Sequence, residues 1–254
     1  MARREATTSQ SGIISNNMIA PDKTSTLFTF KGFVGGLLKS WPIAIGVFAY
    51  GLVFGFLSEQ AGLSLFDAVA MCVIVFAGTS QLVAMGIWIT PLPIWTIIFT
   101  TFAVNMRYIL EGAAVEPYLR GLKRWQKYLS LFYMNDESWA LSLSKFKHGL
   151  KDRAFMLGSG IAVLIAWTSS TVVGHVMLAG VTDPSRWGLD FALTAVFLSM
   201  LVSMWRGKSD IAPSIVAAMV AVAAHKLLPG TWYIFLGAIA GSSASLISWR
   251  RKNV

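Results

Sequence analysis

Phe76-Ala77-Gly78-Thr79-Ser80-Gln81 is a polar interruption at the centre of an apolar run from Leu65 to Ile89. The run is long enough to cross a bilayer, which takes about 20 apolar residues. Hydrocarbon offers no hydrogen-bond partners, so the hydroxyls and the amide must find partners within the protein. The interruption is therefore either a contact between packed helices or part of a path for a polar solute.

The composition of the whole chain is that of a polytopic helical membrane protein. The 254 residues are 55% hydrophobic and 13% charged, whereas soluble domains carry roughly 25% charged residues. The apolar runs do not alternate with polar residues as the strands of a transmembrane barrel do. We expect an all-α fold with roughly seven to eight hydrophobic segments. These form a single transmembrane domain, residues 31–254, behind a disordered cytoplasmic tail, residues 1–30.

The charge distribution predicts the orientation of the chain. Its net charge is +9, from 21 basic and 12 acidic residues. This excess is typical of cytoplasmic loops that face anionic lipid, and it favours a membrane over a nucleic acid as partner. Basic residues precede the first apolar run, cluster at 120–127 and 145–153, and close the chain at Arg250-Arg251-Lys252. The positive-inside rule therefore predicts both termini in the cytoplasm.

A count of apolar runs conflicts with this orientation. Three runs, 41–57, 65–89 and 94–114, separate the N-terminus from the 120–127 loop, although both are predicted to be cytoplasmic. An odd number of crossings cannot join two segments on one side. A helix that is broken or re-entrant near Gly78 restores the parity, as in many transporters. The alternative is that the charge rule fails for one loop.

The segment 128–146 raises the same question, because basic clusters lie on both sides of it. It holds Asp136-Glu137, so these carboxylates lie either within the membrane or in water at its interface. An ionisable residue at membrane depth is a functional candidate. The segment either dips in and returns or crosses against the charge rule.

The later apolar runs, 155–179, 189–205, 211–228 and 232–249, are expected to cross. A faint likeness between Gly62-Leu63-Ser64 and Gly188-Leu189-Asp190 suggests an internal repeat. Gly51 and Gly55 form a GxxxG motif, which either packs against another helix or faces a substrate.

The order of motifs along the chain resembles a known family. The motifs are Pro42, Gly46, Tyr50-Gly51 and Gly55, then Phe76-Ala77-Gly78-Thr79-Ser80-Gln81, Asn105-Met106-Arg107 and Asp136-Glu137. They resemble the AzlC-like (azaleucine-resistance) proteins, the large subunits of branched-chain amino-acid exporters. The resemblance runs from about Gly36 to Gly188, and more loosely to the C-terminus. It implies a secondary transporter that exports branched-chain or other apolar amino acids across the bacterial inner membrane, with a small AzlD-like membrane subunit.

Three positions depart from the family pattern. Tyr108 stands where the family often has histidine, Glu111 is not part of the pattern, and Thr79-Ser80 replaces what are often two small residues. These departures bear on the substrate more than on the general function. Some family members are named ABC permeases, but this sequence contains no Walker A motif.

The predicted substrate-binding residues are Gly78, Thr79, Ser80, Gln81, Asn105 and Arg107, with Asp136 and Glu137 as partners of an ammonium group or a coupling proton. Arg107, or free N–H groups at a break near Gly78, would bind a carboxylate. Gln81 and Asn105 would orient the ligand.

Phe76 and Val75 would form an apolar wall of this site. Structural roles are the alternatives for the polar residues. They are a salt bridge from Arg107 to Glu111 or Asp136, and hydrogen bonds between helices for Gln81 and Asn105.

Catalysis and metal binding find no support in the sequence. His148, His175 and His225 lie in separate segments, without an HExxH motif or histidine and cysteine at ligand spacing. We therefore predict no enzyme, no cofactor and no metal. A non-transporting membrane scaffold or assembly subunit is the alternative function. It explains the glycines, but not the arginine, the asparagine and the acidic pair together.

Overall fold

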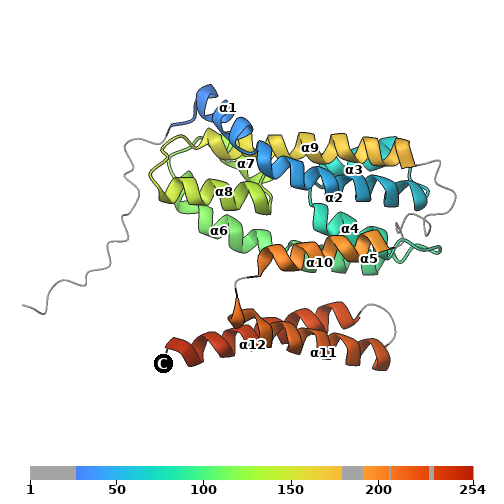
Figure 1. Ribbon diagram of the computed structural model, residues 1–254. Helices are drawn as coiled ribbons and strands as arrows, with labels where there is room; N and C mark the ends of the chain where they lie inside the picture. Colours follow the sequence, from blue (N-terminus) through green and yellow to red (C-terminus); the bar gives the residue numbers. More distant parts are fainter. Residues whose placement is uncertain (1–26, 179–190, 206, 229–231, 254) are drawn as a thin grey trace, which may run out of the picture.

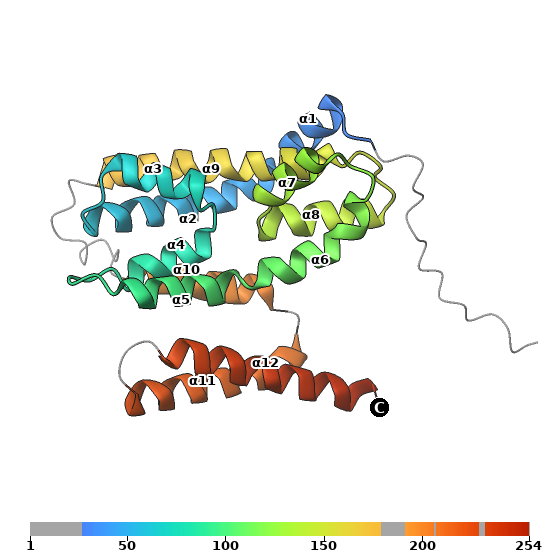
Figure 2. The same ribbon diagram turned by 180° about the vertical axis from the view of Figure 1, so that it is seen from behind.

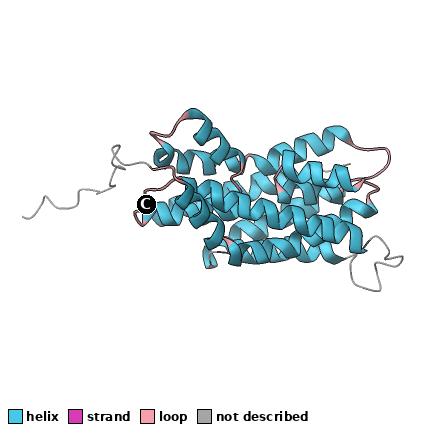
Figure 3. Cartoon of the chain, turned by 90° about the horizontal axis from the view of Figure 1, so that it is seen from above, coloured by secondary structure: helices cyan, strands magenta, loops and turns pink. Residues whose placement is uncertain are grey.

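The structure, a computed structural model, describes residues 27–178, 191–205, 207–228 and 232–253 and confirms the predicted all-α fold (Figure 1). The helices are α1 (Phe30–Lys39), α2 (Trp41–Gln60), α3 (Leu65–Ile74), α4 (Gly78–Gly86), α5 (Ile94–Asn105), α6 (Arg107–Leu119), α7 (Arg124–Phe132), α8 (Asp136–Lys147), α9 (Ala154–Leu178), α10 (Ala192–Met204), η3 (Lys208–Asp210), α11 (Ile211–Leu227) and α12 (Trp232–Asn253). Seen from above, the described chain consists of helices joined by loops (Figure 3).

Two long helices, α2 and α9, lie side by side along the upper layer of the molecule (Figures 1 and 2). Glycines bring their backbones together: a Cβ placed at Gly55 would lie 2.1 Å from the carbonyl oxygen of Thr171. In α1, a Cβ at Gly36 would lie 2.0 Å from the carbonyl oxygen of Phe155. The contacts advance in the same direction along both partners, so α1–α2 and α9 are parallel. The Gly51 and Gly55 motif therefore packs helices, one of the two roles that the sequence left open.

The apolar run 65–89 is broken, as the parity of the loop charges predicted. Helix α3 ends at Ile74 and α4 begins at Gly78. Phe76, between them, has a φ of 43°, a left-handed conformation that is unusual for a bulky residue. The chain reverses there, and α4 returns toward the end of the molecule at which α3 began (Figure 2). We call α3 and α4 the first hairpin.

The segment 128–146 also enters and returns, because it forms two short helices, α7 and α8, joined by Tyr133, Met134 and Asn135. The two helices have 9 and 12 residues. At about 1.5 Å per residue neither can cross a hydrocarbon core of about 30 Å. We call α7 and α8 the second hairpin. The Asn135 side chain caps α8, and Asn135 and Ser138 form a capping box that fixes its start.

The predicted single helix at 94–114 is wrong in one detail, since α5 and α6 are separate helices that meet at Met106. No glycine or proline marks this interruption in the sequence. Together α5 and α6 run the length of the molecule, back toward the end where α2 begins (Figure 2).

Because α2 and α9 are parallel, the chain between them must run back along the molecule once, and α5 and α6 make this return. This agrees with the parity argument. The first hairpin therefore starts from the end of the molecule where α2 ends, and the second hairpin starts from the end where α2 begins. The backbone confirms that the N-terminal segment and the loop after α8 lie together: Leu27 N donates to Lys151 O at 3.2 Å, and Arg153 N donates to Leu27 O at 2.8 Å.

Within the described residues, three helical stretches are both long enough and apolar enough to cross a membrane: Trp41–Gln60, Ala154–Met177 and Lys208–Leu227. Large apolar side chains such as Phe66, Ile74 and Leu110 are exposed on the outside of the bundle, as suits contact with lipid.

Toward the C-terminus, α11 and α12 pack through small residues, with a Cβ at Gly241 only 2.8 Å from the Ala217 Cβ. The predicted crossings 211–228 and 232–249 correspond to α11 and α12, and 189–205 corresponds in part to α10. Residues 1–26 of the predicted tail and the 188–190 half of the faint repeat lie outside the described residues.

Candidate functional site

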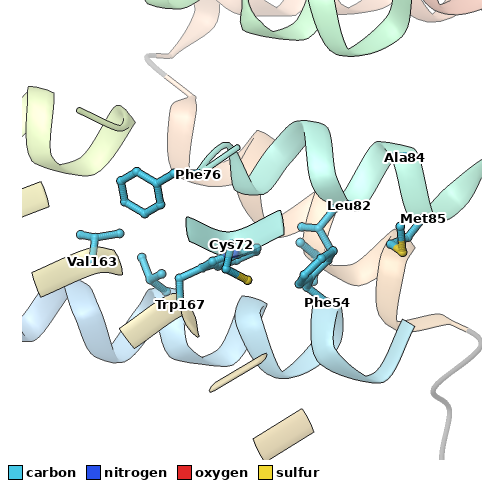
Figure 4. Close-up of a cluster of buried hydrophobic side chains, with 10 residues drawn as sticks. Phe54, Cys72, Phe76, Leu82, Ala84, Met85, Val163 and Trp167 are labelled. Carbon is cyan, nitrogen blue, oxygen red and sulfur yellow. The ribbon is translucent and has the colours of Figure 1, made fainter. Parts of the chain in front are cut away.

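The tips of the two hairpins meet in the middle of the molecule. The ring of Phe76 lies edge-on to the ring of Tyr133, with centroids 6.1 Å apart. Behind them, a buried apolar cluster joins α2, the first hairpin and α9 (Figure 4). Among its members, Phe54 and Trp167 stack their rings with centroids 5.6 Å apart. The cluster holds the tip of the first hairpin against α2 and α9.

A cavity of about 50 Å³ lies where the tips meet. Its polar lining consists of Tyr50, Thr79, Tyr108, Asn135, Asp136 and Glu137, and its other lining residues are Val47, Phe76, Gly78, Leu82, Val163 and Trp167. The contributions of α2 and α9 come from the centres of these helices, which places the cavity far from either end. A volume of this kind holds a few water molecules or part of a small solute.

One guanidinium group links the two hairpins. Arg107 Nη2 lies 2.8 Å from Asp136 Oδ2 of the second hairpin, and it donates to Thr79 Oγ1 of the first hairpin at 3.0 Å. The break at Met106 places Arg107 at the start of α6, between both tips. The side chains of Arg107 and Asp136 are 24% and 32% exposed, so the pair is half-buried rather than fully solvated. Of the two salt-bridge partners that the sequence suggested, the structure shows Asp136.

Four predicted site residues line the cavity: Gly78, Thr79, Asp136 and Glu137. The other four, Ser80, Gln81, Asn105 and Arg107, are not among the lining residues. Asn105 Nδ2 donates to Ser80 Oγ at 3.3 Å, and Ser80 Oγ donates to Ala77 O at 2.9 Å.

Gln81 is 1% exposed, and its Nε2 lies 3.9 Å from Cys72 Sγ. The Gln81 and Asn105 amides thus join neighbouring segments of the fold, the structural role that the sequence left open. Val75 and Phe76 were predicted to form an apolar wall. Of the two, only Phe76 lines the cavity, whereas Val75 is 44% exposed.

Two helix N-termini lie at the cavity, and each carries a partial positive charge. Helix α8 is capped, because Ser138 N donates to Asn135 Oδ1 at 2.8 Å. Helix α4 has no side-chain cap, so no side chain occupies the N–H groups of its first turn. An uncapped helix N-terminus beside carboxylates suits a ligand that has both an acceptor and a cationic end.

Sequence reasoning missed several lining residues. Asn135 immediately precedes Asp136-Glu137, and an asparagine before an acidic first turn is a helix N-cap signal that would have indicated the start of α8. Tyr50 was part of the family pattern but received no role, and its hydroxyl lies 2.8 Å from Ser199 Oγ. Tyr108 was noted only as a departure. Trp167 carries no signal that separates a cavity wall from core packing.

Other ionisable residues lie away from the cavity or beside it. His175 is a packing histidine, with Nδ1 3.1 Å from Ser58 Oγ. Glu111 lies one turn after Arg107, and its backbone oxygen accepts from Trp139 Nε1 at 3.0 Å. Within the described residues, no group of three or more histidine, cysteine, aspartate or glutamate side chains could hold a metal ion.

The fold and the site together define a class of membrane protein in which broken helices meet at a polar cavity, as in many transporters. The chain belongs to the AzlC family: the family described as AzlC protein matches residues 42–181, more than half of the sequence. The resemblance seen in the motifs is thereby confirmed.

Relatives cover nearly the whole chain. An uncharacterized membrane protein of Archaeoglobus fulgidus is 28% identical over 213 residues, covering 82% of this chain and 92% of the relative. The inner membrane protein YgaZ of Escherichia coli is 26% identical over 222 residues, covering 85% and 90%. The branched-chain amino acid transport protein AzlC of Bacillus subtilis is 24% identical over 200 residues, covering 78% of each chain.

No solved structure shows a significant match to the chain. Family membership makes this chain a membrane transport protein and not an enzyme.

Proposed function

We propose that the protein is a secondary transporter that exports branched-chain or other apolar amino acids across the bacterial inner membrane. The observation that carries the proposal is the cavity at the hairpin tips. It combines the carboxylates of Asp136 and Glu137, the uncapped N-terminus of α4, and an apolar wall of Val47, Leu82 and Val163. A zwitterion with an apolar side chain needs these three kinds of surface. The name of the Bacillus subtilis relative supports the same substrate class.

The proposed orientation has both termini in the cytoplasm. Support comes from the basic residues of the 120–127 loop and the 145–153 segment, which lie at the end of the molecule where α2 begins. Cytoplasmic loops of membrane proteins carry such an excess of lysine and arginine. With this orientation the first hairpin enters from outside and the second hairpin enters from the cytoplasm.

The family resemblance adds a partner to the proposal, a small AzlD-like membrane subunit. The exposed apolar side chains of the described helices offer such a subunit a surface within the bilayer, although lipid alone would also cover them. The transport experiment therefore includes the chain with and without this subunit.

The test is transport by the purified protein in liposomes. Liposomes loaded with unlabelled leucine should accumulate labelled leucine, valine or methionine by exchange, and they should exclude labelled lysine and glutamate. Empty liposomes give the background. If no amino acid exchanges with or without the small subunit, the transport proposal is refuted and the scaffold function remains.

A further inference from the structure

We propose that Asn135 and the N-terminus of α4 bind the carboxylate of the transported amino acid, while Glu137 binds its ammonium group and Arg107 holds the hairpins together. This inference rests on the proposed function, because it assigns roles within the same cavity. It differs from the sequence-based prediction, in which Arg107 was one of two candidates for the carboxylate.

The first step concerns Asn135. It is 6% exposed and lines the cavity. Its Oδ1 accepts the hydrogen bond from Ser138 N that caps α8. Its Nδ2 has no hydrogen-bond partner in the described part of the chain. A buried donor without an acceptor is costly, so an acceptor bound in the cavity that Asn135 lines would satisfy it.

The second step concerns the opposite hairpin. Gly78 and Thr79 begin α4 and line the same cavity, and no side chain caps this helix. A Cβ placed at Gly78 would lie 3.0 Å from the Trp167 ring, so glycine lets the ring close over the start of α4. The first residues of α4 in one hairpin and Asn135 in the other therefore line the same cavity. Two converging sets of donors suit the two oxygens of a carboxylate.

The third step concerns the charges. Arg107 is not among the lining residues, and its Nη2 already contacts Asp136 and Thr79, which do line the cavity. The positive charge of Arg107 is thus offset by Asp136. Glu137 lines the cavity, and none of the salt bridges among the described residues includes it. A carboxylate in this position suits a ligand ammonium group, with the apolar side chain of the ligand against Leu82 and Val163.

The main test removes the Nδ2 donor of Asn135 and keeps an oxygen that caps α8. Asn135→Asp and Asn135→Ser both retain an oxygen that caps α8 well. Each removes Nδ2, and the aspartate also repels a carboxylate. We expect the KM for labelled leucine to rise about tenfold or more in both variants, because a hydrogen bond to a charged group is lost. Melting temperatures in detergent should stay close to that of the wild type.

A second readout distinguishes ligand binding from a structural effect. Leucinamide keeps the ammonium group and the side chain but lacks the carboxylate. In the wild type, leucine should compete with labelled leucine far better than leucinamide does. In Asn135→Asp this preference should collapse, because only leucine loses a contact.

The ammonium role is tested with Glu137→Gln, and Glu116→Gln serves as the matched control, since Glu116 pairs with Arg120 away from the cavity. We expect Glu137→Gln to lose most leucine uptake at low concentration, while Glu116→Gln transports like the wild type.

Two outcomes would overturn these assignments. One is a wild-type KM in Asn135→Asp together with an unchanged preference for leucine over leucinamide. The other is wild-type leucine uptake in Glu137→Gln. A wild-type protein that moves no amino acid at all would instead refute the proposed function, so the two failures are distinguishable.

Discussion

Arg107 links the two hairpins through its side chain. It reaches Thr79 and Asp136 through one nitrogen, at 3.0 and 2.8 Å. Arg107→Ala should abolish amino-acid efflux while leaving membrane insertion intact, because both contacts are lost and Asp136 keeps an unpaired charge. Efflux and the amount of protein in the membrane fraction are the two measurements.

The double variant Arg107→Ala with Asp136→Ala provides the control for Arg107. The loss of melting temperature in the double variant should be smaller than the sum of the losses in the two single variants, since no charge is left without its partner. Wild-type efflux by Arg107→Ala alone would contradict any role of this side chain in transport.

Asp136 also tests whether a proton is coupled to transport. If its carboxylate carries the coupling proton, Asp136→Asn should transport at a rate that no longer changes with pH. The wild type would show a clear pH profile over the same range. The measurement is the rate of leucine exchange across a pH series. An unchanged profile in Asp136→Asn would exclude Asp136 as the proton carrier and leave Glu137 and Glu111 as candidates.

Single residues were only partly predictable from the sequence. Four lining residues were predictable, because polar positions in an apolar run mark polar contacts at membrane depth. They are Gly78, Thr79, Asp136 and Glu137. The sequence could not show that Gln81 is buried against Cys72 instead of lining the cavity, because an amide near a break is compatible with either position. Which side of a short helix faces the cavity depends on packing, and no local pattern specifies it.

At the scale of helices, the contact between α2 and α9 depends on the absence of side chains. Gly55→Ala should destabilise the protein by about 1–3 kcal/mol, because the new Cβ would lie 2.1 Å from the Thr171 carbonyl oxygen. Gly46→Ala in the same helix is the matched control. A Cβ there meets nothing within 4 Å, so alanine should be neutral or stabilise the helix by up to about 1 kcal/mol. Melting temperatures of the two variants in one detergent make the comparison; equal values would be inconsistent with the packing described.

The turn of the first hairpin can be tested at Phe76, whose φ is 43°. Both Phe76→Ala and Phe76→Gly lose the buried ring, at a cost of about 3–5 kcal/mol. Glycine alone adopts a positive φ without strain, so Phe76→Gly should be about 1 kcal/mol more stable than Phe76→Ala. In an ordinary helix the alanine variant would be the more stable of the two. Thermal unfolding of both variants therefore shows whether the chain reverses at this residue.

The sequence predicted the elements well where charge or composition constrained them. The break in 65–89 followed from the parity of the basic loops together with a polar centre. The break at Met106 did not, because no glycine or proline lies beside it in the sequence. Helix α1 was also missed: its sequence contains three glycines, and its stability comes from packing against α9 through Gly36.

At the scale of the whole molecule, the topology predicts which residues an impermeant reagent can reach. With Cys72 replaced by serine, cysteines placed at Arg120 and Lys147 should be protected from a maleimide added outside the cell. A cysteine at Gly62, in the loop between α2 and α3 at the other end of α2, should react. Permeabilised cells, in which all three react, give the control. Labelling of Arg120 or Lys147 positions in intact cells would refute the orientation.

The packing of α9 against helices from both hairpins has a consequence for biosynthesis. Helix α9 packs against α1, α2, α3, α7 and α8, yet its sequence begins only at Ala154. Both hairpins are therefore synthesised before the surface that covers them exists. Until α9 arrives, their interrupted backbones would face lipid with unsatisfied N–H and C=O groups. A ribosome paused after residue 153 would hold a chain whose hairpins remain at the insertion machinery, and release into the bilayer would follow the synthesis of α9.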